Sequence, residues 1–159
     1  MDRADVVIVG AGITGLSAGY WMAKAGAKVI VLDKGRVAWE ASSRATGYLS
    51  LRADQPRESP LAVVAEQLWG TLDDELGYPT EWTPRGRMWA AFNEVQLEEL
   101  KNTFESFQRS TVPFRLIDGD EARELLPALS PQVLGAIHTH HSGHANPQRT
   151  SQAFAWAFQ

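Results

Sequence analysis

The chain has 159 residues, of which 44% are hydrophobic and 21% are charged, as in ordinary globular proteins. Its formal net charge of −4 gives no basic footprint for nucleic acid, and its lack of cysteine excludes disulfides, thiolate metal sites and cofactor attachment through cysteine. No stretch approaches the roughly 20 apolar residues of a membrane span, and no signal peptide is recognisable, so we expect a cytoplasmic chain.

The first 33 residues predict a β-α-β unit. Residues 5–10 (DVVIVG) and 28–33 (KVIVLD) are short apolar runs of the kind that forms buried parallel strands. Between them, apolar residues recur at helical spacing and Gly26 is a suitable stop. The two strands are therefore expected to pair in parallel through a right-handed crossover.

The rest of the chain predicts helices interleaved with extended pieces. Residues 34–47 read as a loop with a short helical turn, followed by an extended piece at 48–51 and a helix from Ser59-Pro60 to Gly77. Residues 81–92 suggest two extended pieces about a turn, 112–117 and 133–140 are strands, and helices begin after Asn93, Asp118 and Asn146. Capping boxes are expected for Asn93 with Gln96 and for Asp118 with Glu121, and the last helix is expected to run to Gln159.

Three glycines lie at the junction of the first strand and helix. Gly10, Gly12 and Gly15 form the pattern G-x-G-x-x-G, which permits a tight turn, close backbone approach to a pyrophosphate, and close packing of helix on sheet. Asp33 ends the second strand, where a carboxylate can accept hydrogen bonds from an adenosine ribose and would repel a 2′-phosphate. The pattern predicts a site for the ADP half of FAD or NAD.

The segment after Asp33 favours FAD. A nicotinamide-binding domain would usually continue with another helix and strand, whereas residues 41–47 (ASSRATG) are small and polar and could close over a pyrophosphate and ribityl chain. Arg44 could neutralise phosphate charge. An NAD-linked dehydrogenase stays open as an alternative.

Four stretches of the chain carry a further signal: residues 5–35, 41–50 (ASSRATGYLS), 114–130 (FRLIDGDEARELLPALS) and 135–158 (GAIHTHHSGHANPQRTSQAFAWAF). Together they resemble the D-amino-acid oxidase superfamily, which includes glycine oxidase, sarcosine oxidase and amino-acid dehydrogenases. The resemblance implies an α/β fold: a Rossmann-like FAD-binding unit from residues 1–52 and 142–159, with residues 53–141 as part of an α+β substrate layer.

The resemblance also implies non-covalent FAD and oxidation of a C–N bond in an amine or amino acid, with hydride passing to flavin N5. The cofactor-binding residues expected by position are Gly10, Ala11, Gly12, Ile13, Thr14, Gly15, Asp33, Lys34, Ser42, Ser43, Arg44, Ala45, Thr46 and Gly47. Catalytic residues cannot be assigned, because relatives draw them mostly from a part that lies beyond these 159 residues.

Other features have competing interpretations. His138, His140, His141 and His144 invite a metal, but no acidic residue nearby completes a set, so we expect no metal. Arg85 and Arg87 could bind a substrate carboxylate or simply belong to a surface turn, and Tyr48 could face the flavin or pack.

The apolar helix of residues 147–159 lacks a stop signal, and only two parallel strands are recognisable. We therefore expect the N-terminal part of a longer flavoenzyme, inactive as an isolated chain. A non-catalytic subunit that docks on a partner chain is the other alternative.

Overall fold

The computed structural model describes residues 3–50, 59–108 and 112–158, which form two compact units. Unit 1 contains residues 3–48, 68–83 and 144–158, and unit 2 contains residues 49–50, 59–67, 84–108 and 112–143. None of the described helices is long and apolar enough to cross a membrane.

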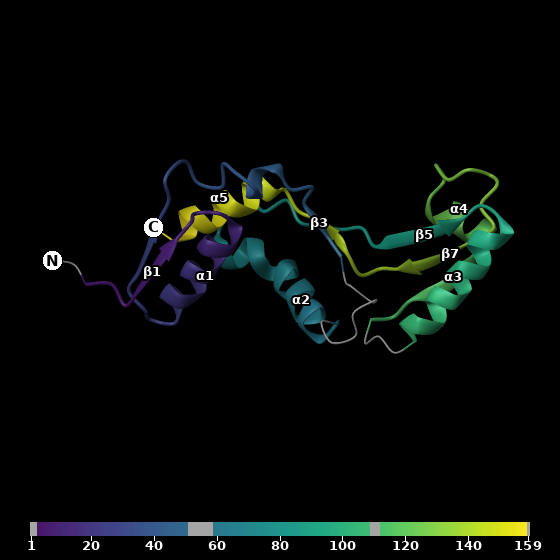
Figure 1. Ribbon diagram of the computed structural model, residues 1–159, viewed down its shortest axis with the longest axis horizontal. Helices are drawn as coiled ribbons and strands as arrows, with labels where there is room; N and C mark the ends of the chain where they lie inside the picture. The colour runs from purple at the N-terminus through teal and green to yellow at the C-terminus, as the bar shows by residue number, and fades with distance from the viewer. Residues whose placement is uncertain (1–2, 51–58, 109–111, 159) are drawn as a thin grey trace. The chain divides into compact units, whose positions relative to one another are not determined.

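Unit 1 begins with the predicted β-α-β unit (Figure 1). Strand β1 (Val6–Val9) pairs in parallel with β2 (Val29–Leu32), in a register that joins Val6 to Val29 and Val9 to Leu32. Helix α1 (Ile13–Lys24) is the crossover, and it packs tightly on one face of the strands because Gly19 has no side chain: a Cβ there would lie 3.0 Å from the Val31 side chain. The parallel strand prediction is confirmed.

The other face of the two strands is open. Val7, Val9, Ile30 and Leu32 alternate with the residues that face α1, and their exposed fractions run from 40% to 85%. Parallel sheets are normally covered on both faces. These four side chains form an uncovered apolar face on the described part of unit 1.

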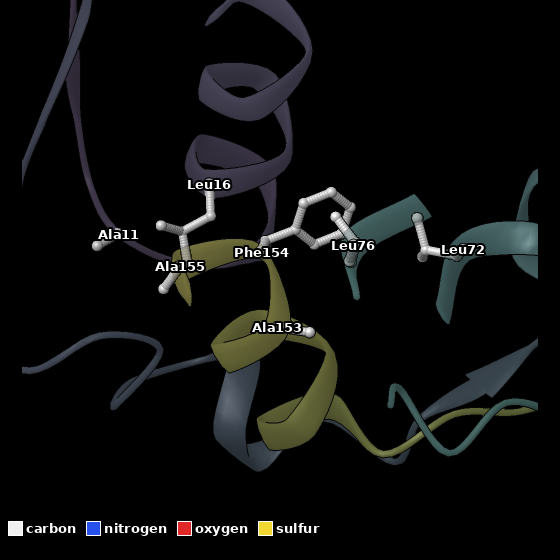
Figure 2. Close-up of a cluster of buried hydrophobic side chains, with 7 residues drawn as sticks. All are labelled: Ala11, Leu16, Leu72, Leu76, Ala153, Phe154 and Ala155. Atoms are coloured by element: carbon white, nitrogen blue, oxygen red, sulfur yellow. The ribbon is translucent and has the colours of Figure 1, made fainter. Parts of the chain in front are cut away.

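Three helices build the core of unit 1. Helix α5 (Pro147–Ala157) lies beside α1, and the C-terminal part of α2 (Ser59–Leu76) completes the cluster (Figures 1 and 2). The buried side chains are Ala11, Leu16, Leu72, Leu76, Ala153, Phe154 and Ala155. Tyr20 joins α1 to α2 by donating a hydrogen bond to the Glu75 carboxylate, which together with burial raises the pKa of Tyr20 to about 12. Because Ala11 is one of these buried residues, the glycine loop is attached to the core of unit 1.

Unit 2 is centred on an antiparallel sheet in the order β5-β7-β6. Strand β7 (Gly135–Thr139) lies between β5 (Arg87–Ala91) and β6 (Arg115–Asp118). Helix α3 (Glu94–Phe107) packs with Ile137 and Ala91, whereas α4 (Gly119–Leu125) brings Ala122 against Ala136 and Ile117. Ile137 and Ala136 point to opposite faces, so each helix covers part of a different face of this sheet.

Three short strands lie where the chain passes from one unit to the other: β3 (Tyr48–Leu49), β4 (Thr83–Pro84) and β8 (Gly143–His144). The 3₁₀ turn η1 (Ser42–Arg44) precedes β3 within unit 1. The expected turn, extended pieces and Gly77 stop are therefore present. Residue 51, part of one expected extended piece, and Gln159, the expected end of the last helix, lie outside the described residues.

Both expected cap residues are present, but neither helix has the complete capping box. Asn93 accepts a hydrogen bond from the Gln96 amide at 2.9 Å, and the Gln96 side chain accepts one from the Phe92 amide. Asp118 also caps its helix, but the Glu121 side chain pairs with Arg115. The adjacent strand β6 supplies this guanidinium, a charged partner that binds a carboxylate more strongly than a backbone amide does.

The expected division of the chain differs from the compact units at residues 49–50, 68–83 and 142–143. Residues 68–83 were assigned to the substrate region, but they belong to unit 1, where Leu72 and Leu76 enter the core. Which part binds cofactor and which binds substrate stays a prediction, since compactness does not report ligands.

Replacing Asn93 by alanine should lower the free energy of unfolding by about 1 kcal/mol, because the Gln96 amide loses its acceptor. Chemical denaturation with circular dichroism measures the change. Lys101→Ala, at an exposed position inside the same helix, is the control. Equal stability of the two variants would contradict the capping role.

Candidate functional site

The glycine loop between β1 and α1 leaves no room for side chains. A Cβ on Gly15 would lie 2.0 Å from the Gly10 carbonyl oxygen, far inside contact distance, and a Cβ on Gly12 would lie 3.0 Å from the Ser42 hydroxyl. Gly10 has a φ of 113°, which L side chains rarely adopt. The three glycines are thus required by the local geometry, and they bring bare backbone to the start of α1.

Unpaired amides gather at this point. The amides of Gly12, Thr14 and Gly15 have no hydrogen-bond acceptor among the described residues, as expected for the first turn of a helix. The first turn of α1 contains no acidic residue that would oppose an anion. The loop therefore presents N–H donors and the positive end of the helix dipole to the same place.

A hollow of about 440 Å³ runs along these amides. It is lined by Gly10, Gly12, Ile13, Thr14, Gly15 and Ser42, together with Ile8, Val9, Ala18 and Met22. Six of the residues predicted from the sequence are therefore brought together. Ala18 and Met22 were missed, although their spacing of four on the helix could have shown that they share a face with Thr14 and Gly15.

Asp33 is tied to the glycine loop by two backbone hydrogen bonds. Its Oδ2 accepts from the Ala11 amide at 2.7 Å and its Oδ1 accepts from the Gly35 amide at 2.8 Å. These bonds stabilise the ionised form and lower the pKa of Asp33, with a smaller contribution from Lys34. Because each carboxylate oxygen has further acceptor capacity, Asp33 can hold the loop and accept a ribose hydroxyl at once.

The segment that follows β2 folds back onto the loop. The Ala38 amide donates to the Ala11 carbonyl at 2.8 Å, and the Ser42 hydroxyl accepts from the Ile13 amide at 3.0 Å. Ala38 is buried and has a φ of 57°, a conformation that favours glycine. Sequence reasoning missed Ala38, because an alanine carries no signal of this conformation.

Other predicted residues of this segment lie away from the hollow. Ser43 donates to the carbonyls of Trp39 and Glu40, and Arg44 is exposed beside Glu40. Lys34, Ala45 and Thr46 do not line the hollow either. Their part in cofactor binding stays a prediction.

Gly47 is explained by packing. A Cβ on it would lie 2.1 Å from the Ala145 carbonyl, and its own carbonyl accepts from the Ala145 amide at 3.0 Å. Tyr48 packs beside His144, with ring centroids 5.5 Å apart. This end of the segment is thus anchored to the chain just before α5.

The histidines of unit 2 do not form one cluster. His138 and His140 share a strand face as expected, with ring centroids 4.7 Å apart, while His141 pairs with Glu66. Within the part of the chain that the structure describes, no three His, Cys, Asp or Glu residues are placed to hold a metal ion. Arg87 stacks on Trp89, whereas Arg85 is exposed in the turn.

A phosphate-bearing dinucleotide fits the residues of unit 1. The glycine loop is a cradle that any Cβ at Gly15 would fill, its amides are unpaired, and a carboxylate is fixed beside it. This is the geometry of a dinucleotide-binding β-α-β unit.

The chain belongs to the DAO family of FAD-dependent oxidoreductases, whose model matches residues 5–159. Among curated proteins it is 29% identical to a glycine oxidase of Bacillus licheniformis, over 96% of this chain and 42% of that protein. It is also 29% identical to the sarcosine oxidase subunit beta of Rhodobacter capsulatus, over 98% of this chain and 38% of the relative.

The solved structure of glycine oxidase from Geobacillus kaustophilus superposes with a TM-score of 0.86 at 27% identity, covering 99% of this chain and 45% of the oxidase chain. The chain therefore spans less than half the length of the relatives it matches. The cofactor of the family is FAD, so the nicotinamide alternative is not supported, and the expected resemblance is confirmed.

Replacing Gly15 by alanine should weaken FAD binding by at least about tenfold, because the added methyl meets the Gly10 carbonyl and displaces the amides. Flavin fluorescence titration of the protein that carries this chain measures the affinity.

Gly70→Ala is the matched control, since a Cβ at Gly70 in α2 meets no atom within 4 Å. It should keep FAD affinity and raise stability by about 0.5–1 kcal/mol. Equal FAD affinity of the Gly15 variant and the parent protein would contradict the role of the loop.

Asp33→Asn should destabilise the protein at neutral pH, because an amide cannot accept both backbone hydrogen bonds as the carboxylate does. The folded-state pKa of Asp33 lies below its ordinary value of 3.8, so its stabilisation is present above that value and is lost as pH falls through the lowered pKa. Urea unfolding across the acid range should therefore show that the difference in unfolding free energy between parent and variant becomes smaller below about pH 4.

Asp74→Asn, at an exposed position of α2, controls for the change in charge. A difference that stays constant with pH would refute this account.

Proposed function

We propose that this chain holds the ADP half of FAD in a flavoenzyme that oxidises the C–N bond of an amine or amino acid. The main support for FAD binding is the set of unpaired amides at the start of α1, which lie beside Asp33. The family match and the similarity to a glycine oxidase and a sarcosine oxidase subunit support the reaction class. Bound FAD would supply the hydride acceptor, flavin N5.

Different residues of unit 1 bind the pyrophosphate and the ribose of the cofactor. The amides of Gly12, Thr14 and Gly15 donate to the pyrophosphate, and the α1 dipole adds to the attraction. Asp33 accepts from the adenosine ribose, and its attachment to the Ala11 amide fixes the distance between the ribose and phosphate subsites. Orientation of the cofactor thus depends on one carboxylate that holds both the loop and the ligand.

We infer that the cofactor is bound without a covalent bond. The segment 34–50, which follows β2, contains neither histidine nor cysteine, and all four histidines of the chain lie between positions 138 and 144. Denaturation should therefore release free FAD. Ser43, Arg44, Ala45 and Thr46 are proposed to approach the cofactor along this segment, with Lys34 near the ribose.

A second candidate function is that of one subunit in a larger flavoprotein assembly. The open face of Val7, Val9, Ile30 and Leu32 supports it, because apolar faces of parallel sheets are normally covered by further polypeptide. The similarity to a sarcosine oxidase subunit also supports it. Mass measurement after gentle purification distinguishes the cases: a stable complex with another chain favours the subunit.

Glycine or sarcosine, added without oxygen to the purified flavin-loaded protein, should bleach the flavin absorbance if a C–N bond is oxidised. Glycolate is the matched control, since it replaces the C–N bond of glycine by a C–O bond. Bleaching by glycolate alone would contradict the amine proposal. Bound flavin that no amine reduces would favour the non-catalytic subunit.

A further inference from the structure

Unit 2 contains a second cavity that plays no part in the dinucleotide site. Its volume is about 340 Å³, room for roughly ten water molecules. The lining residues are Arg85, Gly86, Arg87, Met88, Leu125, Leu126, His138 and His140. All of them belong to unit 2, so the cavity is defined by that unit alone.

Part of the lining of this cavity is cationic and donates hydrogen bonds. Arg85 is exposed in the turn before β5, whereas Arg87 is held over the Trp89 ring. His138 and His140 stand next to each other at the end of β7. Arginine and imidazole N–H groups are the donors that bind a carboxylate.

His138 has a buried nitrogen without a partner. The side chain is 93% buried, and its Nδ1 has no hydrogen-bond partner among the described residues. A buried N–H without an acceptor is costly, so the neutral ring is favoured with its proton on Nε2. Nε2 lies beside Gly86: a Cβ on Gly86 would lie 3.5 Å from it, and the Thr139 carbonyl oxygen, 2.5 Å from the same Cβ, excludes a side chain at this position.

The rest of the lining is apolar. Leu125 and Leu126, at the end of α4, are each 45% exposed, and Met88 on β5 is the cross-strand neighbour of His138. Apolar side chains next to cationic donors fit an anion that carries a hydrocarbon chain. Inorganic phosphate would leave the leucines in contact with water and gain nothing from them.

None of the described residues that line the cavity is an aspartate or glutamate, and Glu121, which acts on His138 from α4, is already paired with Arg115. An ammonium group in the ligand would therefore face Arg85 without an acidic lining residue to offset the repulsion. The same argument disfavours a metal cation, since two imidazoles beside an arginine do not complete a ligand set.

We propose that this cavity is a binding site for a small monocarboxylate with an apolar chain and no ammonium group. The carboxylate pairs with Arg85 and accepts from His138 Nε2–H and from His140. The hydrocarbon chain lies against Leu125, Leu126 and Met88. This site stands on unit 2 alone and does not depend on the proposed flavin chemistry.

The probes are 4-methylpentanoate and leucine, which share a branched skeleton but differ in the ammonium group, with 4-methylpentanol and inorganic phosphate as further controls. Calorimetry on the protein that carries this chain measures the affinities. 4-Methylpentanoate should bind at least about tenfold more tightly than the other three compounds. Leucine adds an ammonium group that Arg85 repels, 4-methylpentanol lacks the carboxylate, and inorganic phosphate lacks the hydrocarbon chain. Equal binding of leucine or of phosphate would overturn the proposal.

His138 provides an independent readout in the parent protein. Burial, His140 and Arg115 lower its pKa, and Glu121 on α4 opposes them. A bound carboxylate favours the charged imidazole, so the pKa of His138 should rise in NMR titrations with 4-methylpentanoate. Unchanged His138 resonances at saturating probe would refute the site.

Arg85→Gln should weaken 4-methylpentanoate binding about fivefold or more, because the charged donor is lost. Arg36→Gln removes an exposed arginine of unit 1 and should leave binding unchanged. Gly15→Ala, which disrupts the dinucleotide loop, should also leave it unchanged, so failure of this proposal and failure of the flavin proposal are distinguishable. An Arg85 variant that binds as tightly as the parent would contradict the assigned geometry.

Discussion

The contact between the Gly10 carbonyl and the backbone of Gly15 is the constraint on which unit 1 depends. A Cβ in that gap would stand 2.0 Å from the oxygen, so α1 can start this close to β1 only with glycine at position 15. The close start exposes the first-turn amides, places Leu16 in the core beside Ala11, and lets the Ala11 amide reach Asp33. The exposed amides, the position of Asp33 and the core packing are thus consequences of one steric condition.

Local signals made much of this predictable. The apolar runs of β1 and β2, the three glycines and the caps at Asn93 and Asn146 depend on residues close in sequence, and each was found where the pattern indicated. Asp33 could be placed because a parallel strand of fixed length carries it to the glycine loop. The family resemblance is confirmed, since the family model matches residues 5–159.

Long-range contacts between side chains and irregular backbone could not be predicted. Ala38 adopts a glycine-like conformation because its amide pairs with Ala11, a contact that no neighbour in sequence announces. Glu121 leaves its expected cap partner for Arg115 because β6 and α4 are adjacent only in the folded unit. The shared strand face of His138 and His140 follows from alternation along the strand, whereas the pairing of His141 with Glu66 is a long-range contact that the sequence does not indicate.

The central claim is that unpaired amides at the start of α1 receive the pyrophosphate of FAD. Backbone amide NMR during titration with ADP, the half of the cofactor that this unit would hold, tests it most directly. The account predicts that the resonances of Gly12, Thr14 and Gly15 shift most, while those of Ser43, which is bonded within its own turn, shift little. Saturation with ADP that leaves the three loop amides unmoved would contradict it.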